Sequence, residues 1–416
     1  MVGWFLLSHR PSKVIVAAPT SRQVKQIVFR EVATMYKSVY PLLSKYGIKS
    51  KLNQAELELD DDWFAVGLST DDPDKFQGFH SKHILVLVDE AAGIPPIIYD
   101  AIDGILSSGE MTKLVMFGNP TARTGRFYDA FNDPKAKSIQ ISAFDTPNFT
   151  DNLLRTPLDL KGKDFSKVKL TAPHLIKPSW VQDKIRRWGA SSPVFQSRIM
   201  GKFPKADKNT LISLDLIEEA VRRHEKMRRR APNPNYALDV ARFGDDKSVV
   251  CKRFGNRIES FTDWQNEDTM ATAAMIAKIL KAERGDCCID TIGVGGGVAD
   301  RLREMGFSSV FDVNVAEPAG EDDVYANRRA ELYMHLKKLF ENGDIGIPDD
   351  DELIAQLSNL RYQFEDNPSS RNRRLQIEPK KEYKKRTGYS PDKADALMIS
   401  YAEEVLGSPQ IHVIEY

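Results

Sequence analysis

The sequence predicts an α/β protein of two domains, and three observations support this fold class. Short aliphatic runs alternate with helical patterns in the first 150 residues, and a second series of the same kind begins at Asn235. Such alternation is typical of mainly parallel sheets. A polar, charged stretch separates the two series, and 416 residues are enough for two or three domains. We expect a first domain at 1–204, a connecting segment at 205–234 and a second domain at 235–416.

The first domain is expected to contain buried parallel strands at 13–19, 84–88 and 114–117. Ile84–Val88 is a run of five aliphatic residues, as in a strand buried on both faces. Residues 23–46 have an amphipathic, mostly helical pattern, with a break expected at Pro41. Ligands of such sheets lie at the carboxyl ends of the strands. The polar groups at those ends are Ala18-Pro19-Thr20, Asp89-Glu90 and Gly118-Asn119-Pro120.

The pair Asp89-Glu90 is typical of P-loop-type NTP-hydrolysing folds, in which the first acid holds Mg²⁺ and the second activates or orients water. Those folds also need a phosphate-binding Walker A loop, G-x-x-x-x-G-K-S/T, and the sequence has no match to it. We therefore expect a P-loop-type ATPase domain that lacks its Walker A loop and hydrolyses ATP poorly or not at all. The loop is missing either because the chain is truncated or because the native start lies upstream. Arg22 is expected either to reach a nucleotide phosphate or to pair with a carboxylate.

The second domain begins with a strand over Tyr236–Ala241 that has Asp239 in its middle. A helical region over 178–200 and a helix at 214–223 precede it. Further strands are expected at 248–254, 257–264, 287–290 and 310–313. A helix is expected at 269–282, a glycine-rich turn at 293–297 leads into a helix through Met305, and a last helix covers 391–405. This order of elements resembles the ribonuclease H-like fold.

Four acids stand out in the second domain. Asp239 lies inside a buried strand, where an unpaired carboxylate is costly. Asp290 ends another strand, and Asp392 and Asp395 lie three apart on one face of the last helix. A cluster of such acids repels itself unless cations occupy it. Two divalent metals about 3.5–4 Å apart would clamp a phosphodiester there, and oxygen ligands favour Mg²⁺ or Mn²⁺. Alternatively, these acids only end strands or cap a helix.

Composition narrows the function classes. Lys+Arg and Asp+Glu both total 59, so a nucleic-acid partner would show only as local patches. Three cysteines are too few for a disulfide framework or a zinc cluster. No apolar run approaches the ~20 residues of a membrane span, and the start of the chain does not read as a secretion signal.

Two basic runs are the local patches. Residues 222–230 hold six Lys or Arg, and residues 371–386 hold eight. A charge run is usually a solvated face, but the second run lies directly before the helix that carries Asp392 and Asp395. Its residues are expected to contact DNA phosphates without reading sequence. They are Arg371, Arg373, Arg374, Lys380, Lys381, Lys384, Lys385 and Arg386.

Taken in order, these motifs resemble the large terminase subunits of tailed double-stranded DNA phages, which package and cut viral DNA. The resemblance covers almost the whole chain. In the first half it rests on Val14–Thr20 with Ser21-Arg22-Gln23, Gln77–His80, Ile84–Ala91, and Gly118–Pro120 with Gly125–Tyr128. In the second half it rests on Gly201–Pro204, Leu238–Ala241 with Gly244-Asp245-Asp246, Asp290–Gly295 and Gly388–Leu397.

The resemblance implies roles for these positions. Asp89 would be the Walker B aspartate, Glu90 would polarise the attacking water, and Gly118-Asn119-Pro120 would be the motif that couples hydrolysis to movement. Asp239, Asp290 and Asp395 would bind two Mg²⁺ or Mn²⁺ ions of a nuclease. Asp392 stands where relatives carry a metal-proximal acid or histidine, and Asp246 is a further candidate.

The implied function is cutting of concatemeric viral DNA and, in the complete protein, translocation driven by ATP and Mg²⁺. The implied partners are duplex DNA, a small terminase subunit and a portal protein, on which the chain would form a ring in the host cytoplasm. Two other interpretations stay open. One is an RNase H-like resolvase or integrase with a degenerate ATPase-like domain, and the other is a DNA-binding assembly subunit without enzymatic activity.

Overall fold

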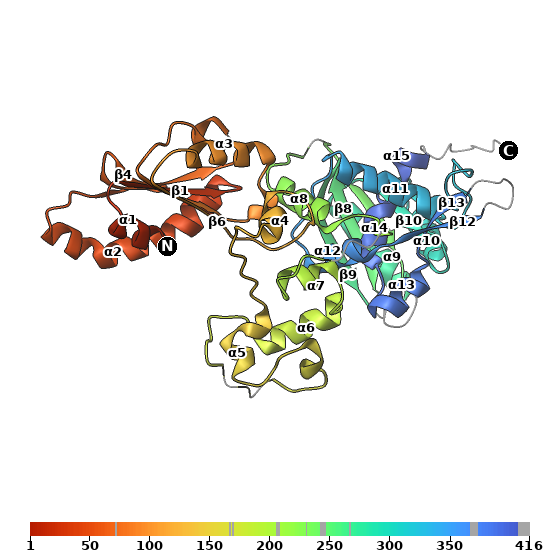
Figure 1. Ribbon diagram of the computed structural model, residues 1–416. Coiled ribbons are helices and arrows are strands. Elements are labelled where there is room, and N and C mark those ends of the chain that lie inside the picture. Colours follow the sequence, from red (N-terminus) through yellow and green to blue (C-terminus); the bar gives the residue numbers. More distant parts are fainter. Residues whose placement is uncertain are drawn as a thin grey trace, which may run out of the picture. The chain divides into compact units, whose positions relative to one another are not determined.

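The computed structural model describes residues 1–70, 73–165, 168, 170–204, 209–229, 231–241, 247–265, 268–366 and 373–406. The chain divides into two compact units, Met1–Gln140 and Ile141–Tyr416 (Figure 1). This division differs from the boundary near Pro204 that we expected. Phe149, Val181 and Phe195 are buried in the core of the second unit together with Leu397. Residues 141–204 therefore pack with the second unit.

The first unit contains a six-stranded sheet in the order β2-β3-β4-β1-β5-β6. Strand β1 pairs in parallel with β4 and β5, and β5 pairs in parallel with β6. The short strands β2 and β3 extend one edge in antiparallel pairing. The bounds are β1 (Ser12–Ala18), β2 (Lys51–Leu52), β3 (Glu56–Asp60), β4 (Trp63–Ser69), β5 (His83–Val88) and β6 (Met111–Met116). The three predicted strands and the mainly parallel sheet are confirmed, whereas β2, β3 and β4 were not predicted.

The helices of the first unit include an unusual turn after β1. Residues Gln23–Val28 form a π-helix (η1), which leads into α2 (Phe29–Lys45). A Cβ on Gly67 would lie 2.4 Å from Val24 Cγ1, so this glycine lets η1 lie against β4. The break predicted at Pro41 is wrong, because this exposed proline removes a single N–H close to the end of a continuous helix. The other helices are α1 (Val2–Ser8), η2 (Pro73–Phe76), η3 (Ala91–Gly93), α3 (Pro96–Leu106) and α4 (Arg126–Asn132).

The second unit contains a five-stranded sheet in the order β11-β10-β7-β8-β9. Strand β8 is antiparallel to both neighbours, whereas β10 is parallel to β7 and β11. This is the ribonuclease H-like order that the sequence predicted. The bounds are β7 (Asn235–Asp239), β8 (Ser248–Phe254), β9 (Arg257–Trp264), β10 (Asp286–Asp290) and β11 (Val310–Val313). A separate antiparallel hairpin joins β12 (Tyr362–Asp366) to β13 (Arg373–Ile377).

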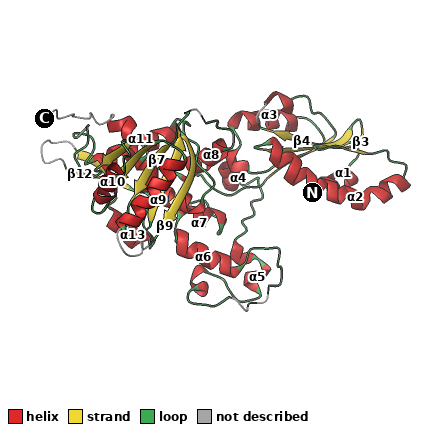
Figure 2. Cartoon of the chain, turned by 180° about the vertical axis from the view of Figure 1, so that it is seen from behind, coloured by secondary structure: helices red, strands yellow, loops and turns green. Residues whose placement is uncertain are grey.

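Helices cover both faces of this sheet (Figures 1 and 2). Leu238 faces α9 (Thr269–Ala282) and α10 (Gly295–Glu304), whereas the adjacent Ala237 faces α11 (Arg328–Glu341), α12 (Asp351–Asn359) and α14 (Asp392–Ile399). The helix expected over 391–405 is interrupted, because α15 (Ala402–Leu406) follows α14 as a separate helix. The remaining helices are η4 (Ala143–Asp145), α5 (Pro147–Thr150), η5 (Pro157–Leu160), α6 (Pro178–Trp188), α7 (Pro193–Arg198), α8 (Leu214–His224) and α13 (Lys380–Thr387). In the part of the chain that the structure describes, we find no helix long and apolar enough to cross a membrane.

Candidate active site

Three of the predicted acids converge on one cation, the ammonium group of Lys380. Its Nζ lies 3.0 Å from Asp239 Oδ2, 3.0 Å from Asp392 Oδ1 and 3.4 Å from Asp395 Oδ2. The three carboxylates are buried, with residue exposures of 5–6%. The structure thus brings together acids that lie more than 150 residues apart in the chain.

The fold explains this convergence. Asp239 is the last residue of β7, not a residue in its middle as we predicted, and Asp290 is the last residue of the neighbouring parallel strand β10. Their carboxyl ends therefore lie at the same edge of the sheet. Helix α14 packs against β7 and β8, and its first turn carries Asp392 and Asp395 three positions apart. Asp290 is half-buried, and its Oδ1 accepts a hydrogen bond from the N–H of Ile292 at 3.1 Å.

Burial raises the pKa of three of these acids. The pKa of Asp239 is raised to about 7, because burial and the neighbouring Asp395 and Asp392 carboxylates together outweigh the lowering effect of Lys380. Burial also raises the pKa of Asp290 to about 6 and that of Asp392 above its usual value. Carboxyl groups with raised pKa values in one place are a physical mark of a functional site. A cation that enters the cluster would favour their ionised forms.

Asp395 is the exception, because basic and hydroxyl groups hold its carboxylate. Its Oδ1 accepts hydrogen bonds from Arg329 Nη2 at 3.1 Å and from the Tyr333 hydroxyl at 2.6 Å. Burial alone would raise the pKa of Asp395, but the Arg329 guanidinium and the Lys380 ammonium lower it below its usual value. Arg329 and Tyr333 were not among the residues predicted from the sequence. They are four residues apart on α11, a spacing that places both on one helix face.

The acids suit a hard divalent cation. Among the residues that the structure describes, no three His, Cys, Asp or Glu side chains form a group that could hold a metal ion, and the Lys380 ammonium stands where the carboxylates meet. Asp392 Oδ1 faces that ammonium at 3.0 Å. The donor set consists of carboxylate oxygens, which Mg²⁺ and Mn²⁺ prefer. The donor set is therefore of the kind that such an ion prefers, and an ion would have to displace the Lys380 ammonium from the place where the three carboxylates meet.

The other basic residues of the second run do not behave as one patch. Lys381 and Lys385 are exposed on α13, Lys384 is half-buried there, and Arg373 is exposed on β13. Two arginines are already paired: Arg374 with Glu365 at 2.8 Å, and Arg386 with Glu378 at 2.5 Å. Arg371 and the candidate acid Asp246 lie outside the described residues. Lys381, Lys385 and Arg373 are thus the exposed basic residues of this run within the described part of the chain.

The first unit brings its predicted polar residues to one edge of the sheet. The Asp89 N–H donates to Ala17 O at 2.8 Å, and the Ala91 N–H donates to Phe117 O at 2.7 Å, so β1, β5 and β6 end side by side. Glu90 adopts a left-handed conformation with φ 50°, which is uncommon for a residue other than glycine. Its Oε1 accepts a hydrogen bond from Gln23 Nε2 at 2.6 Å. Arg22 and Asn119 are exposed at the same edge.

Comparisons with known proteins agree with the resemblance seen in the motifs. No protein-family model matches the chain. The chain is 25% identical over 351 residues to a probable terminase large subunit of Enterobacteria phage P7. That match covers 80% of this chain and 66% of the phage P7 protein, so the chain spans just under two thirds of the relative's length.

Solved structures with some likeness to the chain include three phage proteins. The nuclease domain of the large terminase subunit gp2 of bacterial virus Sf6 is 20% identical, covering 46% of this chain and 97% of that one, with a TM-score of 0.38. A large terminase from a thermophilic bacteriophage is 14% identical, covering 97% and 89%, with a TM-score of 0.37. The magnesium-bound terminase nuclease of thermophilic phage G20c is 18% identical, covering 41% and 82%, with a TM-score of 0.31.

These TM-scores are low, so the assignment rests on the sequence match and on the order of the motifs. The match to the phage P7 protein extends over 351 residues, more than either unit contains. Over four fifths of its length, this chain is similar in sequence to the probable terminase large subunit of Enterobacteria phage P7.

Proposed function

We propose that the chain is a nuclease that uses Mg²⁺ or Mn²⁺ to hydrolyse phosphodiester bonds of duplex DNA. The observation that carries this proposal is the convergence of Asp239, Asp392 and Asp395 on one cation position, beside Asp290 on the next strand. A structural role would leave such acids paired one to one. Among the described residues, the three carboxylates face only the Lys380 ammonium and the Arg329 guanidinium, so they retain a negative excess, which attracts further cations.

The protein residues would act as follows. Asp239, Asp290, Asp392 and Asp395 would hold two divalent ions, which when bound supply charge stabilisation at the phosphorus and an activated water. Asp239 ends β7, the central strand of the sheet, which places it among the residues that would hold the ions. Arg329 and Tyr333 hold the Asp395 carboxylate in one orientation through two hydrogen bonds.

Exposed basic side chains would bind the DNA phosphates and bring the DNA to the acids. Lys381 and Lys385 lie on the helix that begins with Lys380, so phosphates bound there would be brought close to the acids. Such contacts position DNA without reading its sequence.

For the whole protein we propose the packaging function of its relatives. The duplex would be concatemeric viral DNA, and the partners would be a small terminase subunit and a portal protein, on which the chain forms a ring in the host cytoplasm. The edge that carries Asp89 and Glu90 would serve ATP-driven translocation with Mg²⁺. Because the Walker A loop is missing from this sequence, we expect weak or no ATP turnover by this chain.

A plasmid digestion tests the nuclease proposal. Supercoiled and linear duplex DNA are incubated with the chain in Mn²⁺, in Mg²⁺ and in EDTA, beside an ATPase assay on the same sample. We expect cleavage with either metal and none in EDTA. Asp239→Asn should abolish cleavage without unfolding the protein. Asp183→Asn, which breaks a surface ion pair on α6, should leave cleavage unchanged. Cleavage by Asp239→Asn at the wild-type rate would contradict the proposal, and a strong preference for branched DNA would favour a resolvase.

A further inference from the structure

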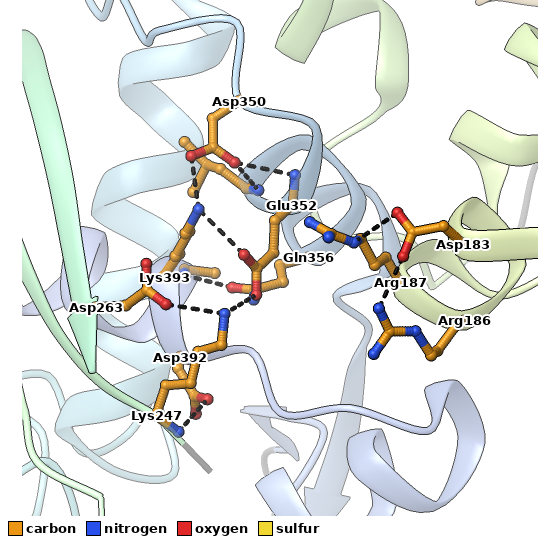
Figure 3. Close-up of polar contacts among 12 residues, drawn as sticks. Asp183, Arg186, Arg187, Lys247, Asp263, Asp350, Glu352, Gln356, Asp392 and Lys393 are labelled. Carbon is orange, nitrogen blue, oxygen red and sulfur yellow. Dashed lines mark hydrogen bonds and ion pairs between the residues drawn. The ribbon is translucent and has the colours of Figure 1, made fainter. Parts of the chain in front are cut away.

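A second polar layer lies on the first turn of α12, next to Asp392 and Lys393 (Figure 3). Asp350 caps this helix, because its Oδ1 accepts hydrogen bonds from the N–H groups of Glu352 and Leu353, both at 3.0 Å. Its other oxygen, Oδ2, lies 2.6 Å from Lys393 Nζ. Lys393 directly follows Asp392 and is itself buried, with 7% of its surface exposed. The first turn of α12 is therefore attached to the first turn of α14, which carries Asp392 and Asp395.

Glu352 joins two lysines that flank Asp392. Its Oε2 lies 3.1 Å from Lys393 Nζ, and its Oε1 lies 3.5 Å from Lys247 Nζ. Lys247 also pairs with Asp263 at 2.9 Å. The backbone N–H of the same Lys247 donates a hydrogen bond to Asp392 Oδ2 at 3.2 Å. The Glu352 carboxylate thus contacts two lysines near Asp392. One is Lys247, whose backbone N–H donates to Asp392, and the other is Lys393, which follows Asp392 on α14.

A hydrogen bond to the backbone of α14 completes this attachment. Gln356, one turn further along α12, accepts a hydrogen bond from the Ala394 N–H at 3.0 Å through its Oε1. Ala394 lies in the first turn of α14, where N–H groups lack partners within their own helix. Figure 3 shows Gln356, Glu352 and Asp350 together facing the Lys393 side of α14. The position of Asp392 is therefore fixed from α12 by ion pairs and by a backbone contact.

We propose that Glu352 is a positioning residue of the nuclease site, which holds Asp392 in the orientation that binds the divalent cation. This inference rests on the proposed function. Without the Glu352 carboxylate, the Lys247 and Lys393 ammonium groups lose the anion they share. The Lys247 N–H and the first turn of α14 can then move apart, and Asp392 Oδ2 loses its fixed donor. Removal of a residue that orients a metal ligand typically lowers metal affinity or activity by 10–100-fold.

Asp351 provides a matched control within the same helical turn. It pairs with Lys184 Nζ at 2.7 Å and with Arg198 Nη1 at 2.9 Å, which belong to α6 and α7 rather than to the acid site. Glu352→Gln and Asp351→Asn each remove one negative charge from the first turn of α12 while keeping the side-chain shape. A purely structural role predicts similar effects of the two changes. A positioning role predicts that only Glu352→Gln changes cation binding.

The experiment measures Mn²⁺ affinity of the full chain by titration calorimetry, beside Mn²⁺-dependent plasmid cleavage. We expect Glu352→Gln to weaken Mn²⁺ binding by about tenfold or more, and Asp351→Asn to change it by less than about twofold. Lys247→Met, which removes the ion pair but keeps the N–H group, should also weaken binding, and it decides the question if Glu352→Gln does not fold. Equal Mn²⁺ affinities of Glu352→Gln and Asp351→Asn would overturn the inference.

Two failures are distinguishable in this design. If the wild-type chain shows no Mn²⁺ binding that depends on Asp239, the proposed function itself is wrong. If the wild-type chain binds Mn²⁺ through Asp239 but Glu352→Gln binds it equally well, only the positioning role is wrong.

Discussion

Removal of the Lys380 ammonium tests the electrostatics of the acid site most directly. In Lys380→Met the side chain keeps nearly its length, but Asp239, Asp392 and Asp395 lose the cation that all three contact. The three carboxylates then repel one another in a buried place. We expect the metal-free second unit to be destabilised, and we expect divalent cations to restore its stability.

The size of the effect follows from burial and from protonation. Breaking a buried ion pair by removal of one partner costs about 3–5 kcal/mol. The Lys380 side chain is 39% exposed, so solvent screening reduces this figure. Asp239 has a pKa raised to about 7, chiefly by burial, and it can take up a proton at neutral pH, which limits the cost. We therefore expect a loss of about 2–3 kcal/mol in EDTA.

Thermal unfolding of the full chain measures this loss. The transition that moves when Mn²⁺ is added reports the second unit, because the acids lie there. A ligand at 100 times its dissociation constant stabilises the folded state by about 2.7 kcal/mol, and we expect the gain to be larger for Lys380→Met than for the wild type. Lys381→Met, an exposed neighbour on the same helix, is the control. The reasoning is refuted if Lys380→Met is as stable as the wild type in EDTA, or if Mn²⁺ stabilises both chains equally.

Three further predictions follow from the same contacts. The folded-state pKa of Asp239, about 7, lies above its unfolded value, so the stability of the metal-free protein should fall as pH rises from about 4 to about 7. The Mn²⁺ affinity measured by calorimetry should rise between pH 6 and 8, because the metal binds the ionised carboxylate. An affinity that does not change with pH would contradict this. Tyr333→Phe removes a buried donor to Asp395 and should cost about 1–3 kcal/mol in urea unfolding, whereas an unchanged midpoint would show that water replaces the hydroxyl. Lys381→Ala with Lys385→Ala should weaken duplex binding in fluorescence anisotropy and reduce the slope against log salt by about 2; an unchanged slope would remove both lysines from the interface.

Regular apolar patterns explain which parts of the fold were predictable. The predicted bounds of β8, β9, α9 and β11 agree with the structure, because each is a continuous apolar or amphipathic run between turn residues. Strands β2 and β3 were not predicted, since residues 51–62 are rich in charges and lie at the edge of their sheet. Strand β4 (Trp63–Ser69) was missed although it is an apolar run inside the sheet. The packing of 141–204 was also unpredictable, because a buried residue such as Phe149 carries no mark of the core that it joins.

The acids of the site could be predicted because they interrupt apolar patterns in the sequence. The basic residue that contacts them, Lys380, could not be recognised in this way. An acid at the end of an aliphatic strand breaks the pattern, so Asp239 and Asp290 stood out. Lys380 was counted with seven other basic residues as a phosphate contact. Charge counts along a chain do not show which side chains point inward. Helical spacing does contain that information, because Lys380 lies three residues before Tyr383, which is fully buried.

The balance of charge around α14 explains why this site needs a cation. The acids are Asp239, Asp290, Asp392 and Asp395 in the site, and Asp263, Asp350 and Glu352 behind it; the described cations that contact them are Lys247, Arg329, Lys380 and Lys393. Ionised acids therefore exceed these cations by three. The layer behind the site is nearly neutral, because two lysines face three acids there, so most of the excess falls on the front. Protonation relieves this excess at low pH, in agreement with the raised pKa values of Asp239 and Asp290. At neutral pH a divalent cation would neutralise more of this excess negative charge than protonation does. The same negative charge that destabilises the metal-free site would thus bind the metal.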